Sequence, residues 1–382
     1  AAPLVRALLH AGYPVIVTTL TPAGRTAGHQ LFKEAIAEGR LQVAYVPLEL
    51  SWAVQRFIRR VKPRAAVMTE IDTWPVLLAT IRRARVPLAM ANAQYPRKSI
   101  ERDQRFGGFR AGVFQAYQLV LCKSVTHAQR FRDVGCTDVV VAGETRFDLP
   151  VSATQIAAAQ ALLAPWRLAT GAPGQRPVLC FASAIVGEDA PFIDAIQRVR
   201  QGVADAGLPP LLVVYVPRSP QRFDEVAAML ADAGLRVARR SRTLDAALAP
   251  VADAPDMAQV DVLLGDSLGE MYFYLALSQV VVVGASFVPM GAHNVIEPLA
   301  LKKPVMVGPS IWGIEYPGVE ALAAGVLQQH MTIASLSAAL VQLLTSPADY
   351  ARAIAGAEAF YAEHGGATAK HMATLVPWLE AR

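Results

Sequence analysis

The sequence VVVVGASFVPMGAHNVIEPLALKKPVMVGP, residues 280–309, predicts a strand, a loop, a short helix and a second strand. Four β-branched residues closed by Gly284 are typical of a strand buried in a parallel sheet. The loop leads into a helix that begins near Glu297–Pro298, because proline fits the first turn of a helix. The next strand is Val305–Val307. In such a fold the loop lies at the carboxyl ends of the strands, where ligands bind.

The start of this short helix has two interpretations. Unpaired backbone N–H groups at a helix start favour an anionic ligand, and Glu297 beside them is suited to accept hydrogen bonds from a sugar diol. The alternative is a helix start like a capping box, in which Asn294 and Glu297 satisfy the backbone of their own segment. The pattern alone leaves both open.

Strands and helices alternate along almost the whole chain, which falls into two halves. Residues 1–150 are expected to form an N-terminal Rossmann-like domain, and residues 177–350 a second domain. Residues 151–176, rich in Ala, Pro and Gly, are expected to link them, and residues 351–382 to form C-terminal helices. Two doubly wound α/β halves joined by a linker predict domains that face each other across a cleft.

The first half begins with a helix at residues 2–11, which leads to a strand at residues 13–19. A doubly wound domain normally begins with a strand. We therefore expect the first strand, and the loop after it, to lie before Ala1. That loop is a prime ligand-binding position in such folds.

The composition of the 382 residues is that of a globular protein, with 53% hydrophobic and 18% charged residues. No apolar run reaches the roughly 18 residues of a membrane span, and the first residues do not read as a signal peptide. Cys122, Cys136 and Cys180 are widely spaced, so we expect core thiols. No clustered His and Cys indicate a metal site, and we expect neither a metal nor another cofactor.

Basic residues concentrate in the first half. Residues 1–150 contain 21 Lys and Arg against 11 Asp and Glu, whereas the remaining residues contain 15 against 20. The first half should therefore attract an anionic partner, such as nucleic acid, anionic lipid or a phosphorylated glycolipid. Because no nucleic-acid motif is present, we expect a membrane surface and a phosphorylated glycolipid as partners, and no nucleic acid.

Residues 265–269, Gly-Asp-Ser-Leu-Gly, match the nucleophile elbow of serine hydrolases and lie between a strand and a helix. A hydrolase also needs an acid and a histidine, and no Asp lies between Ser267 and His330. The other interpretation is a loop that presents backbone N–H groups at a helix start. The glycine-rich motifs of dinucleotide-binding and ATP-binding loops do not occur.

Charged residues at strand ends are further candidates for a site. Arg218 closes a strand of the second half, where its guanidinium suits a phosphate, and the alternative is a surface salt bridge. In the first half Glu70 ends one strand and Arg146 follows the last one. We expect both to face the cleft.

Taken together and in order, these loops resemble the 3-deoxy-D-manno-octulosonic acid (Kdo) transferases of lipopolysaccharide assembly. The resemblance covers nearly the whole chain, and the ordered set is more specific than any one piece. It rests on Thr18–Pro22, Glu70–Pro75, Asn92–Ala93, Gly143–Asp148, Gly187–Glu188, Val216–Phe223, Gly265–Glu270, Gly284–Pro298 and Lys303–Pro309.

The resemblance implies a two-domain GT-B fold and an inverting glycosyltransferase, in which residues 1–150 would bind the acceptor and residues 177–350 the CMP-sugar. The enzyme would transfer Kdo from CMP-Kdo to the lipid A precursor lipid IVA, as a peripheral protein at the cytoplasmic face of the bacterial inner membrane. Glu70 and Arg146 would be catalytic and stabilise the transition state. The residues implied to contact CMP are Pro217, Arg218, Leu268, Gly269, Glu270, Asn294, Val295, Ile296 and Glu297.

The sequence departs from the family pattern in several places. The general base of the family is a glutamate in a Ser-Val-Gly-Glu segment, which is expected to lie before Ala1. Arg146 stands where a lysine is usual, and Gln94-Tyr95-Pro96 replaces an Arg-Leu-Ser pattern. The alternatives are therefore another GT-B nucleotide-sugar transferase or epimerase, or a non-catalytic CMP-binding homologue that lacks the catalytic glutamate.

Overall fold

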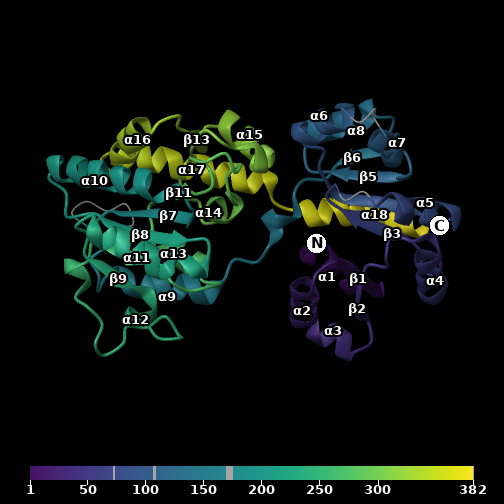
Figure 1. The fold of residues 1–382 in the computed structure, drawn as a ribbon, viewed down its shortest axis with the longest axis horizontal. Helices are drawn as coiled ribbons and strands as arrows, with labels where there is room; N and C mark the ends of the chain where they lie inside the picture. Colours follow the sequence, from purple (N-terminus) through teal and green to yellow (C-terminus); the bar gives the residue numbers. More distant parts are fainter. Residues whose placement is uncertain (72–73, 106–108, 169–174, 382) are drawn as a thin grey trace. The chain divides into compact units, whose positions relative to one another are not determined.

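The computed structural model describes residues 1–71, 74–105, 109–168 and 175–381, and it divides into two compact units (Figure 1). Unit 1 consists of Ala1–Leu149 and His364–Arg382, and unit 2 of Pro150–Glu363. Each unit is an α/β domain whose sheets are parallel, as the alternation of strands and helices predicts.

The strands of unit 1 form two sheets. A two-stranded sheet pairs β1 (Val15–Thr19) with β2 (Leu41–Tyr45). A four-stranded sheet has the order β3 (Ala66–Thr69), β4 (Leu88–Ala93), β5 (Leu119–Cys122) and β6 (Val139–Val141). Within the described residues no strand joins β1 to β3, and the strand expected before Ala1 stays a prediction.

The helices of unit 1 are α1 (Ala2–His10), α2 (Pro22–Leu31), α3 (Lys33–Ala37), α4 (Ser51–Val61), α5 (Pro75–Arg83), α6 (Arg97–Arg105), α7 (Phe109–Phe114), α8 (Val125–Asp133) and α18 (Ala367–Glu380). Thr21 begins α2 because its hydroxyl accepts a hydrogen bond from the N–H of Gly24. The helical segment breaks at Phe32, between α2 and α3, and the side chain of Phe32 is buried in the core.

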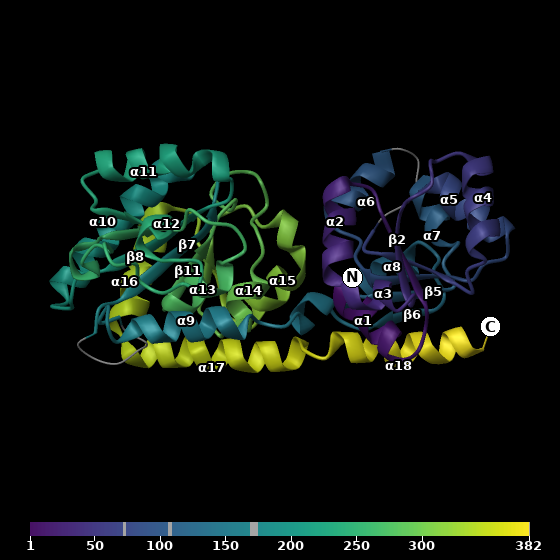
Figure 2. The same ribbon diagram turned by 90° about the horizontal axis from the view of Figure 1, so that it is seen from below.

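α18 returns the end of the chain to unit 1. It packs beside α1 and across the sheet of β3 to β6, as two views show (Figures 1 and 2). Its buried residues share one hydrophobic core with α1 and the sheet, formed by Leu4, Ala89, Ala91, Leu119, Leu121, Ala142, Leu375, Trp378 and Leu379. Residues 351–382, expected as one group of C-terminal helices, are therefore divided between the two units.

Unit 2 is built on a seven-stranded parallel sheet with the order β13-β12-β11-β7-β8-β10-β9. Its strands are β7 (Val178–Ala184), β8 (Leu212–Pro217), β9 (Val237–Arg239), β10 (Val262–Leu264), β11 (Val280–Val283), β12 (Val305–Val307) and β13 (Leu327–Gln329). The strand order reverses between β7 and β11. The carboxyl ends of these two strands therefore form the topological switch point at which such sheets bind ligands.

The helices of unit 2 are α9 (Ala153–Leu163), α10 (Asp189–Asp205), α11 (Phe223–Asp232), α12 (Arg240–Thr243), α13 (Met271–Leu277), α14 (Ile296–Ala300), α15 (Glu315–Ala323), α16 (Ile333–Thr345) and α17 (Pro347–His364). α9 lies in the segment expected to be a linker. It packs instead on α13, where the Gln155 side chain donates to the carbonyl of Gly269 (2.8 Å) and accepts from the N–H of Phe273 (3.2 Å).

Gly284 closes β11 for a steric reason. A Cβ at this position would clash with the carbonyl oxygen of Ser183, so the backbones after β7 and β11 approach too closely for any side chain. Ser183 and Ala285 both have positive φ angles, of 62° and 60°. The quoted stretch therefore folds as its pattern predicts, with a sharp turn at the switch point.

Candidate active site

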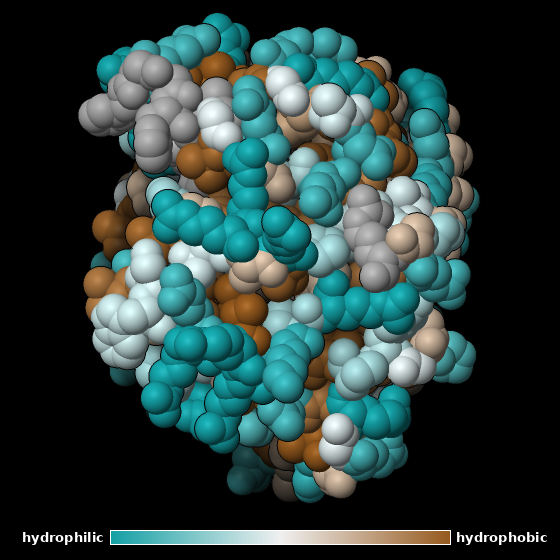
Figure 3. Space-filling view, turned by 90° about the vertical axis from the view of Figure 1, so that its right-hand side faces the viewer, coloured by the Kyte–Doolittle hydropathy of each residue, from teal (hydrophilic) through white to brown (hydrophobic). Residues whose placement is uncertain are grey.

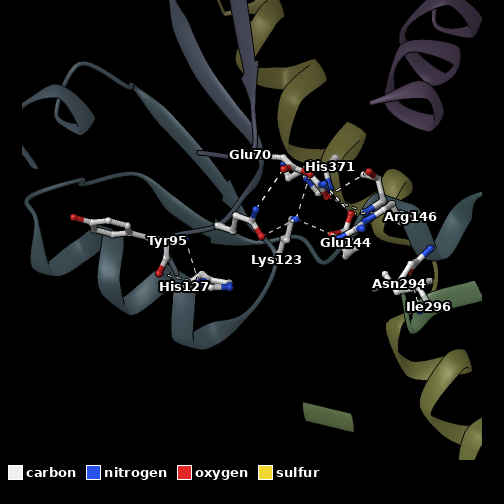
Figure 4. Close-up of polar contacts among 12 residues, drawn as sticks. Glu70, Tyr95, Lys123, His127, Glu144, Arg146, Asn294, Ile296 and His371 are labelled. Carbon is white, nitrogen blue, oxygen red and sulfur yellow. Dashed lines mark hydrogen bonds and ion pairs between the residues drawn. The ribbon is translucent and has the colours of Figure 1, made fainter. Parts of the chain in front are cut away.

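The carboxyl ends of β3 to β6 bring charged and polar residues together in unit 1 (Figure 4). Glu70 follows β3, Gln94 follows β4, Lys123 follows β5 and Glu144 follows β6. Because the four strands are parallel, the residues after them lie at the same edge of the sheet. Glu70 and Arg146, which are 76 positions apart in the sequence, meet in this network.

Lys123 and Glu144 form an ion pair at the centre of the network. The Nζ of Lys123 lies 2.8 Å from Oε2 of Glu144, and neither side chain has any exposed surface. Lys123 also donates to Oε1 of Gln94 at 3.1 Å and lies 3.6 Å from Oε1 of Glu70. A buried charge pair of this kind is stable only when hydrogen bonds satisfy the remaining polar atoms, which is the case here.

The carboxyl of Glu144 is held in its ionised form. Burial alone would raise its pKa, but the positive charges of Lys123 and Arg146, with their hydrogen bonds, lower the pKa to about 2. Its Oε1 also accepts from the side-chain amide of Asn92 at 2.7 Å. Glu144 is thus a fixed negative charge beneath the edge of the sheet.

Glu70 presents its carboxylate at the surface of this network. Its backbone is left-handed, with φ at 62°, and its side chain is 46% exposed. The second carboxylate oxygen accepts from Nε2 of Gln94 at 3.3 Å. The loop continues into residues 72–73, which lie outside the described residues, so the expected segment Glu70–Pro75 is described only in part.

Arg146 lies on the side of Glu144 that faces away from Lys123 and Glu70 (Figure 4). Its guanidinium donates to Oε2 of Glu144 at 3.0 Å, and its backbone N–H donates to Oε1 at 3.2 Å. The side chain is 41% exposed, so the cation is tethered at one end and accessible at the other. Glu70 and Arg146 therefore present opposite charges from one buried anchor.

α18 completes the site from the far end of the chain. The Nε2 of the buried His371 accepts a hydrogen bond from the backbone N–H of Asn92 (3.0 Å), so its proton lies on Nδ1, which donates to the carbonyl of Ala367 (2.8 Å). Burial lowers the pKa of His371 and favours this neutral form. Asp148 caps α18 by accepting from the N–H groups of Gly366 and Thr368.

Sequence reasoning missed Lys123, Glu144 and His371. Lys123 follows the apolar strand Leu119–Cys122, and Glu144 lies in a segment that was singled out only for its resemblance. A strand-end position was the one available signal, because nothing in the local sequence indicates that these charges are buried.

In unit 2, Pro217 ends β8 and Arg218 follows it, one strand from the switch point. The side chain of Arg218 is exposed, and within the described residues it forms no ion pair, in contrast to the surface salt bridge considered above. The pKa of His293, in the loop after β11, is lowered mainly by burial and also by the positive charge of Arg218. The Arg218 guanidinium and the loop after β11 therefore lie close together.

The loop after β10 carries Ser267, Leu268, Gly269 and Glu270. Ser267 bonds to Glu270 and Tyr274, and no histidine bonds to it among the described residues, so the loop lacks the geometry of a hydrolase elbow. Arg240 of α12 donates to Oε1 of Glu270. The Glu270 carboxylate is therefore bound internally, and the exposed Leu268 and left-handed Gly269 form the outer part of the loop.

The loop after β11 ends in α14. The side chain of Asn294 accepts from the N–H of Ile296 at 3.0 Å, a local turn that satisfies the start of the helix. Val295 and Ile296 are buried, so they face the core of unit 2 and can reach a ligand only through their backbone. Glu297 is half-buried beside Tyr272, whose pKa rises to about 12 through burial and the Glu297 charge.

A buried carboxylate fixes the backbone at the switch point. Glu188 has no exposed surface, and its two oxygens accept from the N–H groups of Ile185, Ala285, Ser286 and Phe287 at 2.7–3.1 Å. Four N–H groups therefore surround one anion. Glu188 joins the loop after β7 to the loop after β11 and holds both rigid.

Comparison with known proteins places this chain in a family. Residues 1–149 match the family model described as 3-deoxy-D-manno-octulosonic-acid transferase (kdotransferase). The 3-deoxy-D-manno-octulosonic acid transferase of Bordetella pertussis is 36% identical over 379 residues, which cover 99% of this chain and 84% of that protein. The chain belongs to the Kdo transferase family. The family member from Haemophilus influenzae is 27% identical over 388 residues, with coverage of 100% and 84%.

A solved structure of another protein has the same fold as this Kdo transferase. A UDP-GlcNAc 2-epimerase from Neisseria meningitidis aligns over 98% of this chain and 95% of its own, with a TM-score of 0.62 and 13% identity. At this identity the likeness concerns the fold alone. The two Rossmann-like units are those of the GT-B class. The segment of the family model includes the whole network from Glu70 to Arg146, whereas the Ser-Val-Gly-Glu segment expected before Ala1 is not part of this sequence.

Proposed function

We propose that this Kdo transferase moves Kdo from CMP-Kdo to lipid IVA, a phosphorylated lipid A precursor, at the cytoplasmic face of the bacterial inner membrane. The observation that carries the proposal is the shared anchoring of Glu70 and Arg146. The resemblance implies that these two residues stabilise the transition state, and both contact the buried Lys123–Glu144 pair.

The chemistry is an inverting displacement. A hydroxyl oxygen of the acceptor forms a bond to the anomeric carbon of Kdo, the bond from that carbon to the phosphate oxygen of CMP breaks, and the hydroxyl proton passes to a carboxylate. The anomeric carbon becomes positively charged in the transition state, and the leaving phosphate becomes more negative. An exposed Glu70 carboxylate suits the first charge and an arginine suits the second.

The donor is assigned to unit 2. Within the described residues Arg218 is an exposed arginine without an ion pair at the carboxyl edge of the sheet, and its fork geometry suits the phosphate of the CMP group. The loops after β10 and β11, with Leu268, Gly269 and Glu297, lie at the same edge. In this assignment arginine and backbone N–H groups meet the phosphate charge, and no metal is required.

The acceptor side is assigned to unit 1 because apolar and basic groups adjoin there. Leu48 and Trp52 are 69% and 64% exposed, and the exposed Arg56, Arg59 and Arg60 follow on α4. Figure 3 shows the face that bears α4 in Figure 1, where hydrophobic side chains are interspersed among hydrophilic ones. Such a mixture suits the interface of an anionic membrane. No helix in the described residues is long and apolar enough to cross a bilayer.

Glu49 explains why these apolar side chains remain exposed. Its carboxylate accepts from the N–H groups of Val76 and Leu77 and so caps the first turn of α5. This anchor fixes the segment between Leu48 and Trp52 against unit 1 while its apolar side chains point outward. A fixed apolar segment beside arginines supports docking to a membrane better than charge alone.

Nucleotide selectivity tests the proposal against the epimerase alternative. The protein, expressed at the full length that its gene encodes, is titrated with CMP and with UDP in a calorimeter. We expect CMP to bind more tightly than UDP. Tighter binding of UDP would instead favour a nucleotide-sugar epimerase or another transferase of the same fold.

A further inference from the structure

Lys123 and Glu144 have no exposed side-chain surface, so neither touches a substrate, yet each contacts a residue assigned to the reaction. We propose that this buried ion pair is the positioning device of the site, in which Lys123 fixes the carboxylate of Glu70 and Glu144 fixes the guanidinium of Arg146. The inference rests on the proposed function, which gives Glu70 and Arg146 their roles.

Two acceptors and one further charge surround the ammonium group of Lys123. It lies 2.8 Å from Oε2 of Glu144 and donates to Oε1 of Gln94 at 3.1 Å, and Oε1 of Glu70 is an ion-pair partner at 3.6 Å, beyond hydrogen-bond length. Gln94 in turn donates to the other oxygen of Glu70 at 3.3 Å. Both oxygens of Glu70 are therefore held from the protein side, and the carboxylate has a defined orientation although it is half exposed.

The carboxylate of Glu144 is equally occupied. Oε1 accepts from the amide of Asn92 and the backbone of Arg146, and Oε2 accepts from Lys123 and the Arg146 guanidinium. Asn92 is fixed in turn because its Oδ1 accepts from the N–H of Thr145 at 2.9 Å. Glu144 therefore cannot move without displacing the segment that carries Arg146.

A purely structural pair would have the same contacts, so stability alone does not identify the role. Removing one charge from a buried pair leaves the other charge unpaired and destabilises the fold in either case. The distinguishing property is energetic coupling. A positioning residue loses its effect on turnover when the residue that it positions has already been neutralised.

The test therefore removes both charges together. In Lys123→Met/Glu144→Gln neither partner is left as an unpaired buried charge, and comparison with Glu144→Gln alone isolates the contribution of Lys123. The control is Arg236→Met/Asp261→Asn in unit 2, an ion pair at 3.0 Å before the amino end of β10, in which Asp261 is buried and Arg236 is half exposed. All variants are made in the full-length protein and assayed with CMP-Kdo and lipid IVA, together with thermal unfolding and CMP titration.

We expect the added Lys123→Met change to lower kcat by about 100-fold, the effect of a misplacement of about 1 Å, with a smaller change in the acceptor KM. The same change should have little further effect in a Glu70→Gln background. CMP affinity should stay unchanged, and the control pair should lower stability without lowering kcat.

The outcomes separate the two proposals. If the wild type transfers Kdo and Lys123→Met lowers kcat equally with and without Glu70, the pair is structural and the positioning role is overturned. If the wild type transfers no Kdo, the proposed function fails, and the positioning role fails with it.

Discussion

Glu144 is a carboxylate with no exposed surface, and its ionisation couples the stability of unit 1 to pH. Its pKa in the folded state is about 2, below the ordinary value of 4.5, because Lys123 and Arg146 outweigh the effect of burial. A lowered pKa stabilises the fold above the unfolded-state pKa, and this stabilisation is lost as the pH falls from about 4.5 toward 2.

We predict that wild-type unit 1 loses unfolding free energy over that pH range more steeply than Glu144→Gln does. Urea unfolding at a series of pH values, followed by a probe in unit 1, measures the slope. Glu101→Gln is the control, since Glu101 forms an exposed pair with Arg97 on one helix turn. Equal slopes in wild type and Glu144→Gln would show that Glu144 is not the titrating group.

The single residue Arg218 allows a second prediction, which concerns binding of CMP. Arg218→Ala should raise the Kd of CMP about 10- to 150-fold, which corresponds to the 1.5–3 kcal/mol of a hydrogen bond to a charged group. The control Arg198→Ala removes an exposed arginine from the middle of α10 and should leave the Kd unchanged. Calorimetry that finds the same Kd for Arg218→Ala and wild type would exclude Arg218 from the donor site.

The residues of unit 1 show what a local pattern can predict. Glu70 and Arg146 were assigned by resemblance, and their strand-end positions indicated only that both face the cleft. Lys123 and Glu144 could not be assigned, because a buried ion pair depends on which strand ends become neighbours. That pairing is a tertiary property, and the four residues come from three different strand ends.

α18 lies at the end of the chain and packs against α1 at its beginning, so the two helices are separated by more than 350 residues in the sequence. Its helical character was expected from the sequence, but its place in unit 1 was not, because amphipathic periodicity does not specify a partner. α9 shows the same limit, since its Ala-rich sequence suggested a linker and Gln155 anchors it to α13 instead. By contrast, β11 and β12 were predictable because short apolar runs rich in valine, bounded by glycine or proline, are typical of buried parallel strands.

We predict that Asp148→Ala lowers the unfolding free energy of unit 1 by about 1 kcal/mol, the usual contribution of a helix N-cap. Asp148 accepts from two N–H groups at the start of α18. Thr332→Ala is the reciprocal control, because Thr332 caps α16 in unit 2 through the N–H of Ser335. Hydrogen exchange of each unit should show the two losses separately. A loss confined to unit 2 for Asp148→Ala would contradict the docking of α18.

For the whole molecule, the distribution of charge between the two halves of the sequence can be counted directly from the residues. The excess of basic residues in residues 1–150 does not depend on the fold. The exposure of Leu48 and Trp52 does depend on it, because the anchor at Glu49 cannot be recognised before α5 and its N-terminus are placed.

Membrane docking should therefore have two separable components. Replacing the exposed Arg56, Arg59 and Arg60 of α4 with glutamine should weaken binding to anionic vesicles at low salt, by about 1 kcal/mol for each residue near the surface. Leu48→Ser/Trp52→Ser should weaken it at low and high salt alike, since burial of apolar surface is not screened. Vesicle sedimentation measures both. Equal binding of all three proteins at low salt would exclude this surface.

The most direct measurement is transfer itself. The full-length protein is incubated with CMP-Kdo and lipid IVA, and mass spectrometry detects Kdo added to the lipid while release of CMP is followed. We expect Kdo-modified lipid with wild type and strongly reduced product with Glu70→Gln, although Glu70→Gln still binds CMP. The proposed function would be wrong if wild-type protein bound CMP but added no Kdo, and the role of Glu70 would be wrong if Glu70→Gln added Kdo at the wild-type rate.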